Sequence, residues 1–195
     1  MRTILSLIFC LAIAAICAAQ PVTEQTKHTE AMLNKVKQLD VMNQILPMLM
    51  TKEQIKNILP SVEKARARVK AAQNKEYTAL KAFEARLNEA YKKAIETGQT
   101  PGRALQAEII RMFQEKGLER MLIAEENTDL VVEALKKHLN AGQIKAATNA
   151  LDPKVFDPSL KPEEMTSEQK LRFFVKEIFL DPVAYDVLIL LGKGT

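Results

Sequence analysis

Residues 51–97 read TKEQIKNILPSVEKARARVKAAQNKEYTALKAFEARLNEAYKKAIET, and this stretch decides the fold. Its apolar residues recur with the spacing of one side of an α-helix. They are Ile55, Leu59, Val62, Val69, Leu80, Leu87 and Ile95, with Ala65, Ala72, Tyr77, Phe83 and Tyr91 on the same side. At 1.5 Å per residue, the stretch predicts a rod about 70 Å long. Pro60 should kink the rod near its start, because proline lacks the N–H that would bond the carbonyl of Lys56.

Capping residues flank the rod. Thr51 and Gln54 form the Thr-x-x-Gln pattern of a capping box, in which each side chain accepts a hydrogen bond from the other residue's backbone N–H. Gly98 is the predicted C-cap. The Thr-x-x-Gln pattern recurs at Thr166 and Gln169, and a methionine precedes both copies. We therefore expect a helix to begin at each box.

The rest of the chain also has the pattern of helices separated by short breaks. Before the rod we expect a frayed segment over 20–27 and a helix over about 29–46 that Pro47 stops or kinks. After the rod we expect a helix capped by Thr100-Pro101 and broken near Gly117, a further helix to Asn140, and a short helix over 143–151. A Pro-containing loop over about 152–164 should follow, then a helix after Thr166 and a last helix after Asp181-Pro182, with a frayed tail over 192–195.

The composition favours helices throughout. The chain has no Trp and only 6 Gly, and it is rich in Ala, Leu, Glu, Lys and Gln, which are strong helix formers. The sequence therefore predicts an all-α fold. We expect an elongated helical arrangement or hairpin built around one long helix at about 51–97, with shorter C-terminal helices. Residues 20–195 are numerous enough for a single domain with a substantial core.

The first 19 residues have the order of a cleavable signal peptide. Arg2 supplies positive charge, residues 4–16 form an apolar run, and small residues lead up to Ala19. A transmembrane helix needs about 20 predominantly apolar residues, and this run is shorter. We therefore expect cleavage after Ala19, with Ala18 as the alternative site, and no stable membrane anchor afterwards.

Export would place the protein in the periplasm of a two-membrane bacterium, or outside the cell otherwise. Both cysteines, Cys10 and Cys17, lie inside the predicted signal peptide. Acylation of Cys17 is an alternative that the bulky Ile16 before it disfavours. Without mature cysteines, the exported domain must be held together by buried apolar surface.

Residue types for catalysis are scarce. The formal net charge of +4 is too small to indicate nucleic-acid binding. His28 and His138 are far apart in the sequence and the mature chain has no cysteine, so no local zinc-ligand set occurs. Gly-rich phosphate loops, nucleophile elbows and His-Glu-x-x-His motifs are missing from the sequence. We expect a protein that is not an enzyme and that needs no cofactor or metal.

A basic stretch in the rod is the candidate interaction surface. Its residues are Lys64, Arg66, Arg68, Val69, Lys70 and Lys75, with no acid between the basic ones. The basic side chains border an apolar seam that includes Val69. One interpretation is a solvated helix whose long side chains cover a partner helix. Another is an amphiphilic surface that attracts acidic or unfolded client proteins, and a third is the seam of a homodimer.

The two boxes, at Met50-Thr51-Lys52-Glu53-Gln54 and Met165-Thr166-Ser167-Glu168-Gln169, carry a family resemblance. With them, the chain resembles the LTxxQ-motif family of small periplasmic proteins, the Spy- and CpxP-type chaperones and stress sensors. Both copies have Met where that family usually has Leu. The resemblance implies all-α, typically cradle-shaped dimers of antiparallel helices, which bind unfolded envelope proteins without ATP or report envelope stress.

These observations lead to two functional hypotheses. The first is an exported helical binding protein, namely an ATP-independent chaperone or an envelope-stress-linked protein. The alternative is a structural or adaptor protein of the cell envelope with one fixed protein partner.

Overall fold

The computed structural model describes residues 24–193, so the predicted signal peptide, its cleavage site and the last two residues lie outside the described residues. The chain divides into one part that ends at Leu39 and a second part that begins at Asp40. The described residues of the first part belong to helix α2 (Glu24–Ile45), which begins within the segment predicted to be frayed. That prediction is wrong for residues 24–27, where the acidic Glu24 stands in the first turn and favours a helix start.

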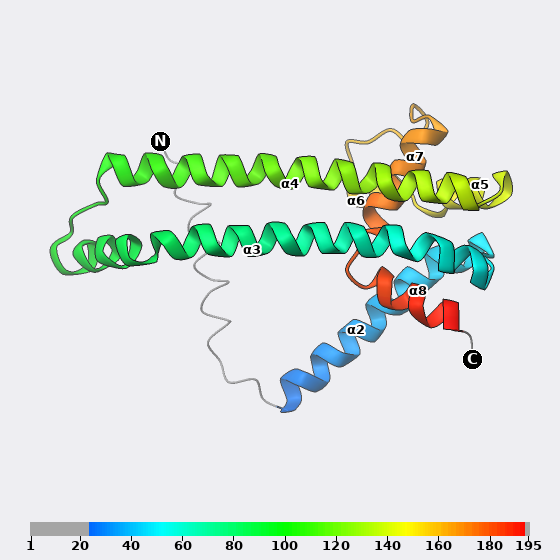
Figure 1. Ribbon diagram of the computed structural model, residues 1–195, viewed down its shortest axis with the longest axis horizontal. Coiled ribbons are helices and arrows are strands. Elements are labelled where there is room, and N and C mark those ends of the chain that lie inside the picture. Colours follow the sequence, from blue (N-terminus) through cyan, green and yellow to red (C-terminus); the bar gives the residue numbers. More distant parts are fainter. Residues whose placement is uncertain (1–23, 194–195) are drawn as a thin grey trace. The chain divides into compact units, whose positions relative to one another are not determined.

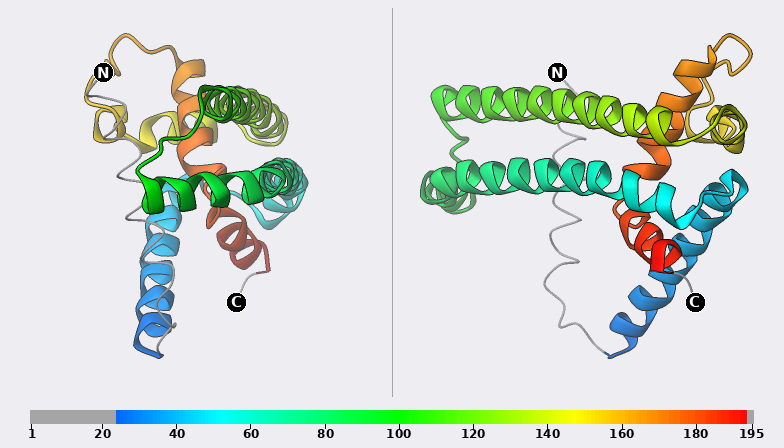
Figure 2. Two further views of the ribbon diagram at one scale, coloured as in Figure 1. Left: turned by 90° about the vertical axis from the view of Figure 1, so that its left-hand side faces the viewer. Right: turned by 45° about the vertical axis from the view of Figure 1, so that its right-hand side comes forward.

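The second part is built around a hairpin of two long helices, α3 (Lys52–Thr97) and α4 (Arg103–His138). They run side by side in opposite directions (Figure 1), and the two turned views show the same pairing (Figure 2). No strand occurs among residues 24–193. The predictions of an all-α fold and of a hairpin around one long helix are confirmed.

Helix α3 begins and ends where the sequence predicts. The backbone N–H of Gln54 donates to Thr51 Oγ1 at 3.1 Å, and the N–H of Thr51 donates to Gln54 Oε1 at 2.9 Å. At the other end, Gly98 adopts a left-handed φ of 67°, and its N–H donates to the carbonyl of Ala94. Pro60 lies inside α3 without ending it.

Helix α4 differs from the sequence prediction at both its start and its middle. Thr100-Pro101 does not cap it, because Gly102 is the N-cap and Arg103 the first helical residue. Gly117 does not break it, and α4 is one helix of 36 residues. A single glycine costs a helix only about 1 kcal/mol, and the packing of α4 along α3 offsets that cost.

Short helices follow the hairpin. They are α5 (Ala141–Ala150), α6 (Pro153–Phe156), α7 (Ser167–Phe174), the π-helical turn η2 (Val175–Phe179) and α8 (Ala184–Lys193). Helix α6 lies within the segment predicted as an extended loop. It forms because the Asp152 carboxylate accepts from the N–H of Lys154 and Pro153 occupies the first helical position. Helix α8 starts later than predicted and continues through residues 192 and 193, which the sequence predicts to fray.

The hydrophobic core lies at the base of the hairpin, where the first turns of α3 meet the last turns of α4. The end of α2, the 3-10 turn η1 (Leu46–Met48) and the helices from α5 to α8 complete it. Its largest fully buried side chains are Ile45, Met48, Ile58, Val62, Val131, Leu135, Leu171, Phe174, Val175, Phe179, Val187 and Leu188. Within residues 40–193, α3 and α4 alone make up the hairpin towards its tip.

Two glycines of the hairpin should respond oppositely to alanine. A Cβ at Gly117 would meet no atom within 4 Å, so Gly117→Ala should stabilise the protein by about 0.4–1 kcal/mol through helix propensity and lower chain entropy. Gly98→Ala places a side chain at a φ of 67° and should destabilise by about 1 kcal/mol. Urea unfolding followed by circular dichroism measures both. A destabilising Gly117→Ala would show that α4 needs a flexible point there.

Candidate binding surface

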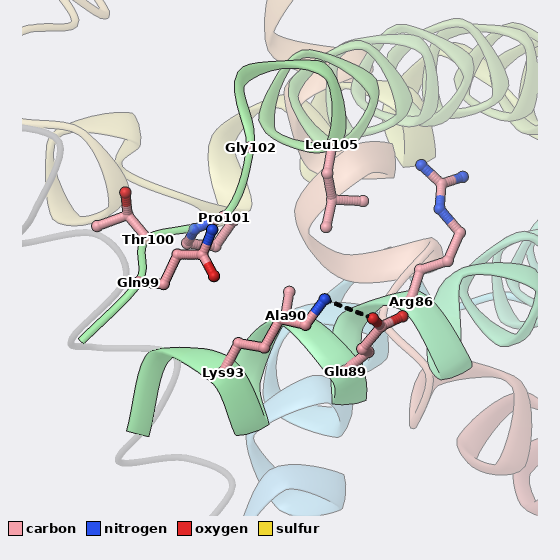
Figure 3. Close-up of a pocket in the computed structure, with 9 residues that line it drawn as sticks. All are labelled: Arg86, Glu89, Ala90, Lys93, Gln99, Thr100, Pro101, Gly102 and Leu105. Atoms are coloured by element: carbon pink, nitrogen blue, oxygen red, sulfur yellow. Dashed lines mark hydrogen bonds and ion pairs between the residues drawn. The ribbon is translucent and has the colours of Figure 1, made fainter. Parts of the chain in front are cut away.

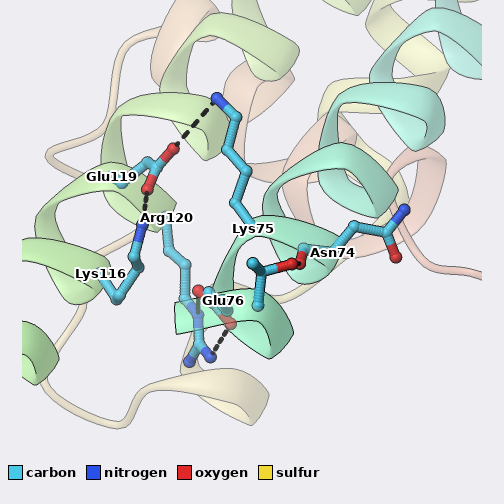
Figure 4. Close-up of polar contacts among 7 residues, drawn as sticks. Asn74, Lys75, Glu76, Lys116, Glu119 and Arg120 are labelled. Atoms are coloured by element: carbon cyan, nitrogen blue, oxygen red, sulfur yellow. Dashed lines mark hydrogen bonds and ion pairs between the residues drawn. The ribbon is translucent and has the colours of Figure 1, made fainter. Parts of the chain in front are cut away.

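One face of the hairpin is joined by ion pairs. Arg68 contacts Glu126 at 3.5 Å, Lys75 contacts Glu119 at 3.7 Å, and a third pair follows nearer the tip. That third pair joins Arg86 to Glu108 at 2.8 Å. Residues 68, 75 and 86 lie within about 20° of one another around α3. Figure 4 shows the Lys75–Glu119 contact, with Lys116 on the same carboxylate.

These pairs determine how α3 and α4 are aligned. Each step along α3 is matched by an equal step back along α4, as an antiparallel pairing requires. An exposed ion pair contributes only about 0–1 kcal/mol, so their main effect is on register. We call the side that carries them the charged face.

The opposite flank of the hairpin is apolar and open to solvent. On α3, Val69, Leu80 and Tyr91 are 42, 44 and 69% exposed. Their spacing of 11 residues keeps them on one side of the helix, about 120° from the charged face. On α4, Ile110 and Phe113 are both 57% exposed. Leu80 and Phe113 line one shallow hollow beside Gly117, which shows that the two helices contribute to the same surface.

We call this surface the open apolar face. It consists of Val69, Tyr77, Leu80, Tyr91, Ile95, Ile110, Phe113 and Met121, all of which are exposed.

At the base of the hairpin, the same flank is covered by the C-terminal helices. The guanidinium of Arg66 on α3 lies 4.1 Å from the ring centroid of Tyr185 on α8. On α4, Glu125 and Asp129 both pair with Arg172 of α7. The open apolar face is therefore the continuation, towards the tip, of the side that α7, η2 and α8 bury at the base.

The structure separates the six residues predicted as an interaction surface. Arg68 and Lys75 lie on the charged face, in ion pairs with α4. Arg66 stacks on Tyr185. These three side chains therefore already have interaction partners within the protein.

The remaining predicted residues are more accessible. Lys64 and Lys70 are exposed, and Val69 opens the apolar face. The seam between the basic flanks is mostly covered, because Val62 and Ala65 are each only 1% exposed. Sequence reasoning missed the exposed residues nearer the tip, whose helical spacing was visible but whose lack of a covering partner was not.

The two predicted capping boxes form as expected, and a third one accompanies them. Asn140 Oδ1 accepts from the N–H of Gln143 at 2.9 Å, and Gln143 Oε1 accepts from the N–H of Asn140 at 3.0 Å. The Asn-x-x-Gln spacing could have revealed this box in the sequence. It starts α5, two residues before the predicted start.

The capping boxes at Thr51 and Asn140 are joined by hydrogen bonds between their glutamine side chains. Gln54 Nε2 donates to Gln143 Oε1 at 2.9 Å, and Gln143 Nε2 donates back to Gln54 Oε1 at 3.0 Å. Gln54 Nε2 also donates to the carbonyl of His138, and Gln143 Nε2 to that of Leu49. The start of α3 is thereby joined to the end of α4 and the start of α5. By contrast, within residues 24–193 Gln169 bonds only to its own box partner, Thr166.

A paired acid and base lie beside the hollow of the open apolar face. Arg120 donates from Nε and Nη2 to the two carboxylate oxygens of Glu76 (Figure 4). These hydrogen bonds lower the pKa of Glu76 below its ordinary value, while the same contact raises the pKa of Arg120. Desolvation opposes the first shift without reversing it. The pair supports the hairpin only while Glu76 is ionised.

A second hollow of about 250 Å³ lies at the hairpin tip, between the end of α3 and the start of α4 (Figure 3). Its charged side chains are already paired. Lys93 contacts Glu89 at 2.7 Å, and Arg86 contacts Glu108. The tip is therefore a polar turn rather than a site with free charge.

A metal site, a membrane-spanning helix and similarity to known proteins would be further indications of function. Across residues 24–193, no three His, Cys, Asp or Glu side chains gather as a metal site would require. Within that range, no helix is long and apolar enough to cross a membrane. No protein-family model, curated protein or solved structure matches the chain.

The side chains of Gln54 and Gln143 should contribute more to the stability of the fold than an ordinary capping residue does. Gln54→Ala and Gln143→Ala should each destabilise by about 1–3 kcal/mol, because each leaves half-buried polar groups without a partner. The double variant should lose less than the two losses added, since both break the same contacts. Gln169→Ala is the matched control, with an expected loss of about 1 kcal/mol. Urea midpoints measure these values, and additive losses would contradict the coupling.

The Glu76–Arg120 pair should give the hairpin an acid-sensitive contribution. A carboxyl whose folded pKa is lowered stabilises the fold above its unfolded value, near 4.5, and loses that effect as the pH falls through the folded value. Glu76→Gln should therefore lower the urea midpoint at pH 7, and the difference from wild type should shrink below about pH 4. Arg120→Gln should give the same profile. A difference that stays constant between pH 7 and pH 3 would contradict this.

Proposed function

We propose that this protein is an exported helical binding protein that holds apolar segments of other proteins without ATP, as a chaperone does. The observation that supports the proposal is the open apolar face of the hairpin. Its residues follow one side of two long helices, and within residues 40–193 no element covers them. Contiguous exposed apolar surface marks interaction sites in soluble proteins.

The residue types on this face suit varied partners. Tyr77, Tyr91 and Phe113 offer large rings with little conformational entropy to lose, and Met121 is flexible and polarizable. Such side chains can pack against many apolar sequences without requiring one shape. This favours a client-holding surface over a single shaped pocket.

Charge at the edges of the face would assist capture. Lys70, from the predicted surface, and Lys81 border it on α3. In the described chain, Lys70 makes no ion pair, and Lys81 lies over the ring of Tyr77. These free cations would attract acidic segments and bring them onto the apolar residues.

Export is the second half of the proposal and rests on residues 1–19. Together with the two Thr-x-x-Gln boxes, it supports a relationship to the LTxxQ-motif chaperones and stress sensors. Mass spectrometry of the protein secreted or released from the periplasm should find Gln20 as the first residue. A full-length chain in the cytoplasm would contradict export without bearing on the binding activity.

An aggregation assay tests the binding activity. Leu80→Gln/Phe113→Gln should lose most of the ability to suppress aggregation of guanidinium-denatured malate dehydrogenase, because both changes remove apolar contact from the centre of the face. Ala82→Gln/Glu115→Gln alters two exposed positions off the open apolar face and should behave as wild type. Light scattering at several-fold molar excess measures suppression. If wild type suppresses nothing, the chaperone proposal fails.

The alternative is an adaptor with one fixed envelope partner. Cross-linking through a photoreactive residue at position 80, followed by mass spectrometry, distinguishes the two. A heterogeneous set of proteins supports the chaperone, whereas one stoichiometric partner supports the adaptor.

A further inference from the structure

An apolar groove lies at the base of the hairpin, away from the open apolar face. The ribbons of α3 and α8 lie close together there (Figure 1). The groove is lined by the first two turns of α3 and the last turns of α8, and its volume is about 580 Å³. Protein sites for small ligands typically measure about 300–1,000 Å³ and are mostly apolar. The groove is therefore large enough for a small amphiphile.

Core residues form the floor of this groove. Ile55 and Leu188 line it although they are 4% and 0% exposed, and the half-buried Leu59 and Ile189 extend it. Gly192 keeps the helices close, since a Cβ there would lie 3.3 Å from Ile55 Cγ2. An alkyl chain in the groove would thus rest directly on the hydrophobic core.

The groove has a cationic end and an apolar end. Helix α8 runs antiparallel to α3, because Tyr185 meets Arg66 while Gly192 lies beside Ile55. This direction brings Lys193 to the same end as Lys52 and Lys56.

All three lysines line the groove. None of them has an ion-pair partner within residues 24–193, and Glu53 is the one acid among the lining residues. The end formed by Leu59 and Ile189 carries no charge. An elongated ligand with one anionic end and one apolar end matches this arrangement.

We propose that the groove between α3 and α8 binds a fatty carboxylate, with its head group at Lys52, Lys56 and Lys193 and its alkyl chain over Ile55, Leu59 and Leu188. Ammonium groups hold a carboxylate by charge-assisted hydrogen bonds. Burial of the chain supplies the remaining affinity. This activity is independent of the proposed holding of client proteins, because none of its residues lies on the open apolar face.

Calorimetric titration of the mature protein with laurate, below its micelle-forming concentration, tests the proposal. Laurate should bind saturably at one site, decanoate should bind up to about 15-fold more weakly, and dodecyltrimethylammonium should not bind. Lys52→Gln/Lys56→Gln/Lys193→Gln should weaken laurate binding about tenfold. Lys70→Gln/Lys81→Gln/Lys92→Gln removes as many exposed lysines elsewhere and should leave it unchanged. Circular dichroism confirms that each variant retains its helicity.

The location of binding is tested separately. Laurate should shift the methyl resonances of Ile55, Leu59 and Leu188, and Leu59→Gln should weaken it as the lysine variant does. Absence of saturable binding, or equal affinity for the cationic detergent, would overturn the proposal. So would loss of laurate binding in Leu80→Gln/Phe113→Gln, because the ligand would then occupy the open apolar face.

Discussion

Within residues 40–193, the apolar side of α3 extends further than the helices that cover it, and the rest of the structure follows from this mismatch. Burial of that side is the main favourable term in holding the helices together. At the base, α4 and α8 pack against α3, and residues such as Ile58 and Val62 are removed from water. Towards the tip, α4 is the one helix of this part of the chain that packs on α3, and one helix can cover only part of an apolar side that is more than 100° wide. Leu80 and Tyr91 are left open for that reason.

The open part of the hairpin stays ordered because other interactions hold α3 against α4. The ion pairs of the charged face set the alignment, and the Glu76–Arg120 pair joins the helices beside the open apolar face. At the base, the reciprocal amide contacts of Gln54 and Gln143 connect three helix ends in a half-buried setting. A rigid hairpin with an uncovered apolar flank can therefore exist without collapse, and this combination is what the proposed client-holding function needs.

Local features were predictable from the sequence where the chemistry is local. The capping boxes at Thr51 and Thr166 and the left-handed cap at Gly98 depend on residues within one turn of each other. Gly117 was misjudged because its helix cost is small and contacts with α3 offset it. Of the predicted surface, the flanking arrangement of Arg66 and Arg68 follows from helix geometry. Their partners, Tyr185 on α8 and Glu126 on α4, lie more than 50 residues away, and no local pattern indicates such pairings.

The sequence by itself determined the all-α class, the long helix over about 51–97 and the sites at which its two ends are capped, because propensity, periodicity and capping act within a few residues. Tertiary structure alone decided which stretch of the apolar side is buried and which is open, and which basic residues are occupied. It also gave Gln54, which caps α3, a second role in joining α3 to the end of α4 and the start of α5. These outcomes depend on which distant segments meet, and burial and pairing are properties of that meeting rather than of any segment alone.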